Sequence, residues 1–153
     1  DIRVFNYFSR TQDLNARFMI TDMLRAIRND EVLQTSPEFI MRDYLHPTDF
    51  HQLVMALLSK QPSNEAVDCY SKAPVEKPDL LTTLQREFGL RYEVLDSIAV
   101  NATGLKPYYF SLSRKAEKFG YSPNLTSLEG LIREFRALTT SPPNMTSTLG
   151  NEL

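Results

Sequence analysis

The sequence predicts an α/β fold, because short runs of strand character alternate along the chain with helices that have one apolar face. Residues 2–8 are almost continuously apolar over the length of a strand, which is typical of a strand buried on both faces of a parallel sheet. Over residues 16–28, apolar side chains recur at intervals of three and four, which indicates an amphipathic helix. Asn29 and Asp30 end this helix, and a short strand is expected at 31–34.

The next part of the chain predicts a strand and a helix that meet at Pro47. Residues 39–46 have strand character and lead into this proline, which favours the first turn of a helix. The polar pair Thr48 and Asp49 is expected to cap the helix, and Gln52 is placed to complete a capping box with Asp49.

The alternation of strands and helices continues in the second half of the chain. A short strand is expected at residues 66–71 and a helix at 77–88, with Gly89 closing the helix. Alternating side chains predict a further strand at 91–95. Residues 98–110 have no clear period.

The last two expected helices are followed by a segment of different composition. A short helix is expected at 113–119, and Thr126 with Glu129 forms a T-x-x-E capping box at the start of the final helix. Residues 139–153 are rich in Thr, Ser, Pro and Asn, which predicts a flexible tail. We therefore expect one domain over residues 1–138.

Composition excludes several classes of partner. The 153 residues are 42% hydrophobic and 24% charged, which is ordinary for one soluble domain. The net charge is -2 and neither sign forms a block, so no nucleic-acid partner is expected. No apolar run approaches the roughly 20 residues that cross a bilayer, so no membrane partner is expected.

The few histidines and the one cysteine indicate no special chemistry. His46 and His51 have no Cys or carboxylate cluster at metal-ligand spacing, so no metal site is expected. The single Cys69 cannot form an internal disulfide, which fits a cytoplasmic location. Its place in an expected buried strand favours a core residue over a nucleophile.

Four segments occur in an order that identifies a family. They are Arg-Val-Phe-Asn at residues 3–6, Met41 to Asp49 with its Arg-Asp pair, the short apolar segment 66–71, and Ser113 to Pro123. Together they resemble the C-terminal, substrate-binding part of the extended short-chain dehydrogenase/reductase family, the NAD(P)-dependent nucleotide-sugar epimerases and dehydratases. The resemblance covers about residues 2–138.

The resemblance implies a Rossmann-type parent enzyme. This chain would supply one or two strands of the long sheet and a small α/β substrate-binding subdomain, and the N-terminal dinucleotide-binding domain would be absent. The family's two upstream motifs are not found, because the five glycines never approach G-x-x-G-x-x-G and none of the seven tyrosines has Lys four positions later. We therefore expect no catalytic residue in this chain and no tight binding of cofactor by it alone, whereas the intact parent, a homodimer, would use NAD or NADP.

The resemblance also assigns the first site residues. Asn6 would hydrogen-bond the sugar or phosphate of the substrate, and Val4 and Phe5 would lie near the cofactor. An Asn amide suits this role because it donates and accepts at the same time. The alternative is that Asn6 ends its strand and organises a turn.

Three further positions are candidates for contacts with the nucleotide. Arg42 would bind the diphosphate, since a guanidinium binds phosphate oxygens bidentately; the alternative is a structural ion pair with Asp43 or Asp49. Arg17 and Phe18 would line the nucleotide pocket at a helix start, although Arg17 could simply be exposed to solvent.

The chain departs from the family at two places beside these candidates. Residues 35–38 replace the family's Gly-Asp-Gly turn, and residues 103–107 replace an Arg with Gly-Asp, so that Lys106 is the candidate for the second phosphate contact. The function expected is the binding of a nucleoside-diphosphate sugar within an NAD(P)-dependent epimerase, dehydratase or reductase. The alternative is a noncatalytic binding or protein-interaction module derived from the same fold.

Overall fold

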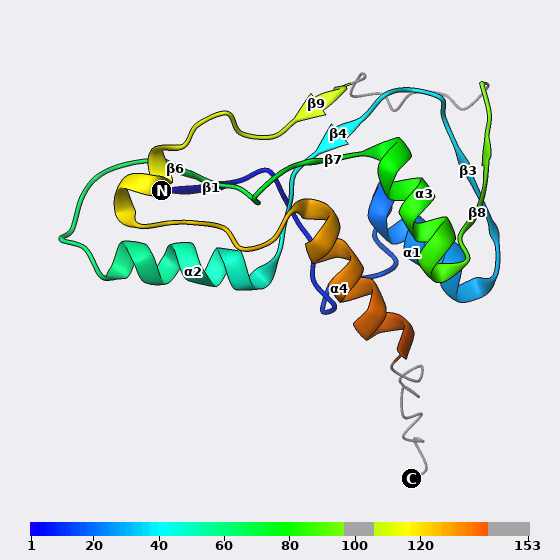
Figure 1. Ribbon diagram of the computed structural model, residues 1–153, viewed down its shortest axis with the longest axis horizontal. Coiled ribbons are helices and arrows are strands. Elements are labelled where there is room, and N and C mark those ends of the chain that lie inside the picture. The colour runs from blue at the N-terminus through cyan, green and yellow to red at the C-terminus, as the bar shows by residue number, and fades with distance from the viewer. Residues whose placement is uncertain (97–105, 141–153) are drawn as a thin grey trace, which may run out of the picture.

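The computed structural model describes residues 1–96 and 106–140 and shows short strands and four α-helices in one α/β arrangement (Figure 1). The strands are β1 (Ile2–Val4), β2 (Asn6–Tyr7), β3 (Val32–Thr35), β4 (Met41–Arg42), β5 (Tyr44–Leu45), β6 (Val67–Cys69), β7 (Val75–Glu76), β8 (Arg91–Val94) and β9 (Tyr108–Tyr109). The helices are α1 (Met19–Asn29), α2 (Pro47–Leu58), α3 (Lys77–Phe88), the 3-10 helix η1 (Lys115–Phe119) and α4 (Ser127–Thr140). The predicted α/β class is confirmed, and the expected helices and strands occur in the predicted order, although β7 and β9 were not predicted and two expected strands are divided.

The opening apolar segment is two strands rather than one. β1 pairs in parallel with β6, and β2 pairs in parallel with β5, so the chain changes sheets at Phe5. Val4 is 38% exposed and Tyr7 is 43% exposed. The expectation of a strand buried on both faces is therefore wrong, because each strand has one paired neighbour among the described residues and lies in a two-stranded sheet.

The segment predicted as a strand at 39–46 is also divided, at Asp43. β4 lies between β7, which is antiparallel to it, and β9, which is parallel to it, whereas β5 pairs with β2. The buried Asp43 carboxylate accepts hydrogen bonds from the amide of Ser71 (3.1 Å) and the hydroxyl of Ser127 (3.0 Å). The bend between the two strands is thereby tied to the segment after β6 and to the start of α4.

The apolar faces of the helices form two cores. In the larger core α1, α3 and α4 pack together through Met23, Leu24, Leu84 and Phe135, which are fully buried. The smaller core joins α2, β5, β6 and η1. Figure 1 shows the two groups on opposite sides of the molecule, with α4 beside the strands that connect them.

The expected capping of α4 is confirmed, and that of α2 is wrong. Thr126 and Glu129 exchange the two hydrogen bonds of a capping box, at 2.8 and 3.2 Å. In α2 the residue before the helix is His46, whose side chain accepts from the amide of Thr48. Gln52 forms no capping box, because its side-chain oxygen has no hydrogen-bond partner within the described residues.

Asp49 contacts a distant segment instead of capping its own helix. Its side chain has no exposed surface and accepts hydrogen bonds from the amides of Asn124 (2.9 Å) and Leu125 (3.1 Å). These bonds fix the chain between η1 and α4 against the first turn of α2. Asp49 is therefore a structural carboxylate.

Replacing Asp49 by alanine is expected to destabilise the fold by roughly 2–4 kcal/mol, because two backbone amides lose a charged acceptor. Chemical denaturation followed by circular dichroism measures this change. Glu93→Ala, on the exposed side of β8, is the matched control and should change stability by less than about 0.5 kcal/mol. Equal effects of the two substitutions would contradict the role given to Asp49.

Candidate functional site

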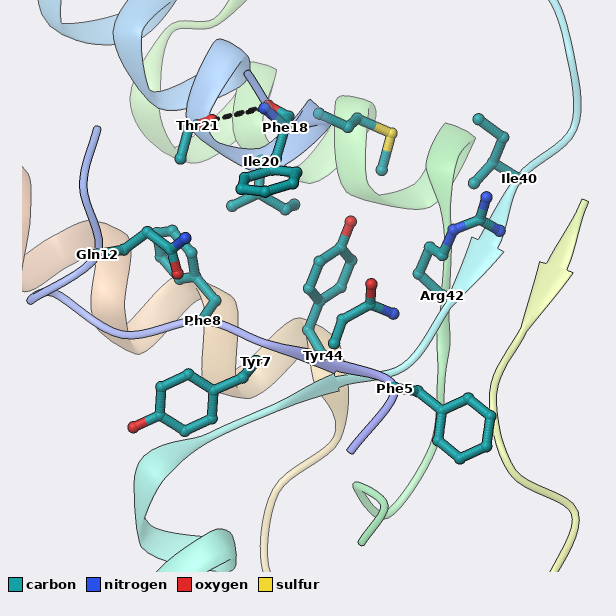
Figure 2. Close-up of a pocket in the computed structure, with 12 residues that line it drawn as sticks. Phe5, Tyr7, Phe8, Gln12, Phe18, Ile20, Thr21, Ile40, Arg42 and Tyr44 are labelled. Carbon is teal, nitrogen blue, oxygen red and sulfur yellow. Dashed lines mark hydrogen bonds between the residues drawn. The ribbon is translucent and has the colours of Figure 1, made fainter. Parts of the chain in front are cut away.

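A cavity of about 430 Å³ opens between β2, the β4–β5 segment and the N-terminus of α1 (Figure 2). Four of the predicted site residues line it: Phe5, Asn6, Phe18 and Arg42. They come from three segments that are separated along the chain, and the pairing of β2 with β5 brings two of these segments together. The sequence motifs thus converge on one hollow of the molecule.

Among the described residues that line this cavity, Arg42 is the only one with a charged side chain. One of its terminal nitrogens, Nη1, donates to the carbonyls of Met41 (2.9 Å) and Pro107 (3.1 Å), which holds the side chain in place. Burial lowers the pKa of the Arg42 guanidinium, but an arginine stays protonated at any physiological pH. The cavity therefore carries a fixed positive charge and favours an anionic ligand.

The structural alternative for Arg42 is wrong. Its expected partners, Asp43 and Asp49, accept hydrogen bonds from other groups, and Arg42 forms no ion pair with either. Its charge is balanced by two backbone carbonyls, which are dipoles rather than anions. The guanidinium thus remains available to neutralise a ligand.

Asn6 organises a turn, as its structural alternative predicts, and it also lines the cavity. Its amide nitrogen donates to the backbone carbonyl of Asp43 (3.1 Å), which organises the bend beside β5. The same side chain lines the cavity, and its amide oxygen has no hydrogen-bond partner among residues 1–96 and 106–140. Asn6 can therefore stabilise the fold and still accept a hydrogen bond from a ligand.

Two aromatic side chains face each other across the cavity in Figure 2, Phe18 from the start of α1 and Tyr44 from β5. Phe18 is 60% exposed, and its backbone amide donates to the Thr21 hydroxyl at the helix N-terminus (3.0 Å). Burial raises the pKa of the Tyr44 phenol, so this hydroxyl stays neutral. It points into the cavity and has no hydrogen-bond partner in the described part of the chain.

The sequence prediction missed Tyr44, although a signal was present. Tyr44 lies two residues after Arg42, and side chains two apart in extended chain point to the same side. The resemblance to the family indicated only the charged residue Arg42 of the Arg-Asp motif. The period of an extended segment would have placed the Tyr44 phenol beside the Arg42 guanidinium.

The other predicted residues lie outside the cavity. Val4 is on β1, and Arg17 is an exposed residue before α1. Lys106 is exposed, with its amine 6.0 Å from the centre of the Tyr109 ring. It adjoins Pro107, whose carbonyl accepts from Arg42, so Lys106 lies near the site without lining it.

The glycines of the described residues do not form a cradle for a dinucleotide. Gly89 and Gly120 close helices in the left-handed conformation, with φ of 70° and 90°. Gly130 lies inside α4 against His46. A pyrophosphate cradle needs glycines between a strand and a helix N-terminus, so these residues do not fit the cofactor.

Neither a protein-family model nor a curated protein matches the sequence. Solved structures do match, among them UDP-glucuronic acid 4-epimerase from Bacillus cereus in complex with UDP-glucuronic acid and NAD, with a TM-score of 0.73 and 18% identity. The chain has the fold of one part of an extended short-chain dehydrogenase/reductase. The match covers 90% of this chain and 44% of the epimerase, so the chain spans less than half the length of that enzyme.

Two further structures with this fold support the same conclusion. UDP-glucose 4-epimerase from Thermotoga maritima with UDP-glucose has a TM-score of 0.69 and 16% identity, over 90% of this chain and 45% of that one. dTDP-glucose 4,6-dehydratase from Bacillus anthracis in complex with NAD has a TM-score of 0.69 and 18% identity, over 88% and 42%. Within the described residues, no helix is long and apolar enough to cross a bilayer, and no group of side chains could hold a metal ion.

Cys69 is expected to resist alkylation in the native protein. Burial, the largest cause, raises the pKa of its thiol to about 11, so about one thiol in a thousand is ionised at pH 8. Labelling with iodoacetamide at pH 8 should be at least about 100-fold slower in buffer than in 8 M urea. Equal labelling rates would show that Cys69 is an accessible thiol.

Proposed function

We propose that this chain is the substrate-binding portion of an NAD(P)-dependent nucleotide-sugar epimerase, dehydratase or reductase. The observation that supports this most is the convergence of Asn6, Phe18 and Arg42 on one cavity. The sequence motifs implied a substrate-binding role for each of these three residues, although the residues lie on separate segments of the chain. The fold supports the proposal independently, because similar structures contain UDP-sugars and NAD.

The proposed ligand is a nucleoside-diphosphate sugar. The Arg42 guanidinium would bind the diphosphate, and the amide oxygen of Asn6 with the Tyr44 hydroxyl would bind hydroxyls of the sugar or phosphate oxygens. Phe18 offers an exposed ring at the mouth of the cavity for the nucleoside. These contacts hold and orient the ligand, and Arg17 and Lys106 would add positive charge near the site.

The redox chemistry of this proposal belongs to another part of the enzyme. When bound, NAD or NADP would accept a hydride from a sugar carbon, and this chain would place that carbon. Val4 and Phe5 would lie at the edge nearest the cofactor. The intact enzyme is proposed to be a homodimer, and turnover by it would separate this proposal from a noncatalytic binding module.

Replacing Arg42 by alanine is expected to weaken the binding of a UDP-, dTDP-, GDP- or CDP-sugar by about 1.5–3 kcal/mol, because a charged hydrogen bond to phosphate is lost. This corresponds to roughly a 10- to 150-fold rise in Kd, measured by isothermal titration calorimetry. Arg42→Lys should recover part of the affinity, since it keeps the charge without the fork.

Arg91→Ala is the control for this titration, because Arg91 is exposed on β8 and pairs with Asp30, away from the cavity. It should bind the nucleotide sugar as the unchanged chain does. An affinity that is the same for Arg42→Ala and Arg91→Ala would remove Arg42 from the binding site. Binding of none of the four nucleotide sugars would refute the proposed function.

Replacing Tyr44 by phenylalanine removes the hydroxyl in the cavity and keeps the ring. We expect an affinity loss of about 1 kcal/mol for the same nucleotide sugar, because one hydrogen bond to the ligand is lost. Stability should stay nearly constant, since the hydroxyl has no partner within the described residues. Tyr92→Phe, outside the cavity, is the control, and equal affinities of the two variants would exclude a contact from Tyr44.

A further inference from the structure

Glu134 is a buried carboxylate on the apolar face of α4. The residue is 3% exposed, between the fully buried Leu131 and Phe135. A charged group at such a position is strongly unfavourable unless its oxygens are paired. Its partners therefore show which parts of the molecule the carboxylate holds together.

Two residues from distant segments bind this carboxylate. Arg10 donates to it three times, through its backbone amide (2.6 Å), Nη2 (2.8 Å) and Nε (3.1 Å). The ring nitrogen Nε2 of His46 lies 3.2 Å from Oε1. The other ring nitrogen, Nδ1, accepts from the amide of Thr48, so Nε2 carries the proton and donates to Glu134.

These partners lie just beyond the ends of β2 and β5, the strands that carry Asn6 and Tyr44. Arg10 is four residues after Asn6, and His46 is two residues after Tyr44, the strand partner of Asn6. Past the paired strands, the amide of Phe8 still donates to the carbonyl of Leu45 (3.3 Å). Glu134 therefore binds both segments of the chain at the point where they leave the paired strands β2 and β5.

The close approach of α4 to this point is built into its sequence. Gly130 lies one turn before Glu134, and a Cβ atom at position 130 would come within 3.1 Å of the Cβ of His46. The ring of Phe135 packs on that of Phe8, with centroids 5.7 Å apart. One face of α4 thus lies close to the ends of both β2 and β5, through Gly130, Glu134 and Phe135.

We propose that Glu134 is a positioning residue of the cavity: it fixes the ends of β2 and β5, and so sets where Asn6 and Tyr44 stand. The inference rests on the proposed function for the identity of the ligand, but its geometry is independent of it. Glu134 does not line the cavity, so it acts through Arg10 and His46. The side chain of Arg10 is 55% exposed, so this part of the network can be removed without opening the core.

The test compares Glu134→Gln with Glu87→Gln in the whole chain. Glu87, near the end of α3, forms a surface ion pair with Arg136 of α4 (2.6 Å), away from the cavity, so its variant loses the same charge without touching the strand ends. In Glu134→Gln, a side-chain NH2 group replaces one carboxylate oxygen. An N–H donor of Arg10 or His46 then faces another donor instead of an acceptor. The measurements are calorimetric affinity for UDP-glucose and UDP-glucuronic acid, and hydrogen exchange of the Phe8 and Tyr44 amides.

A positioning role predicts that the folded Glu134→Gln protein binds the nucleotide sugar at least about tenfold more weakly, while Glu87→Gln binds normally. Its Phe8 and Tyr44 amides should also exchange at least about tenfold faster, since both are hydrogen-bonded beside the network. Unchanged affinity in a folded but less stable Glu134→Gln protein would overturn the proposal and leave Glu134 as a stabilising residue only.

Two alternative measurements decide on Glu134 if the nucleotide sugars do not bind or if the Glu134→Gln protein does not fold. If the unchanged chain binds none of the UDP-, dTDP-, GDP- and CDP-sugars, the proposed function fails, and exchange of the two amides alone decides on Glu134: faster exchange supports positioning and unchanged exchange overturns it. If Glu134→Gln does not fold, Arg10→Ala replaces it, because the backbone amide of residue 10 still reaches Glu134. That variant should weaken binding on the order of threefold, and an affinity equal to that of Glu87→Gln would overturn the proposal.

Discussion

The buried carboxylate of Asp43 determines how the site is assembled. Its side chain binds the amide of Ser71 and the hydroxyl of Ser127, and its backbone carbonyl accepts from Asn6. These bonds fix the bend at which the chain passes from one sheet to another. Arg42 and Tyr44 flank Asp43 on either side and reach the cavity because the bend is held. The geometry of the cavity thus depends on a residue that does not line it.

The electrostatic character of the site follows from what surrounds Arg42. Backbone carbonyls orient the guanidinium, and the nearby carboxylates of Asp43 and Asp49 are bound to other donors. The Tyr44 phenol adds a neutral group that can donate or accept a hydrogen bond. A ligand with an anionic part and several hydroxyls matches this combination, as a nucleoside-diphosphate sugar does.

The sequence predicted those features that local patterns encode. The helix periods and the capping box of Thr126 and Glu129 agree with the structure, because both depend on residues within one or two turns. Asp49 was predicted wrongly because its partners, Asn124 and Leu125, lie about 75 positions away and compete with capping. Helix position alone could not show that competition.

The site was predicted only in part, because sequence motifs record local patterns and not contacts between distant segments. Asn6, Phe18 and Arg42 belong to short motifs, whereas Glu134 acts through tertiary contacts that no motif records. A signal existed, since an acidic residue stands between Leu131 and Phe135 on an otherwise apolar helix face. Such a residue indicates a buried partner, but the sequence does not say that Arg10 is that partner.

The presence of two separate cores has a consequence for cooperativity. The cavity is lined by Phe8 and Ile20 from the larger core and by Tyr7, whose ring packs on Phe50 beside the smaller one. Units with separate interiors can open at different free energies, and only what bridges them makes them unfold together. A molecule bound in the cavity would contact residues beside both cores. It would therefore couple the unfolding of one core to that of the other.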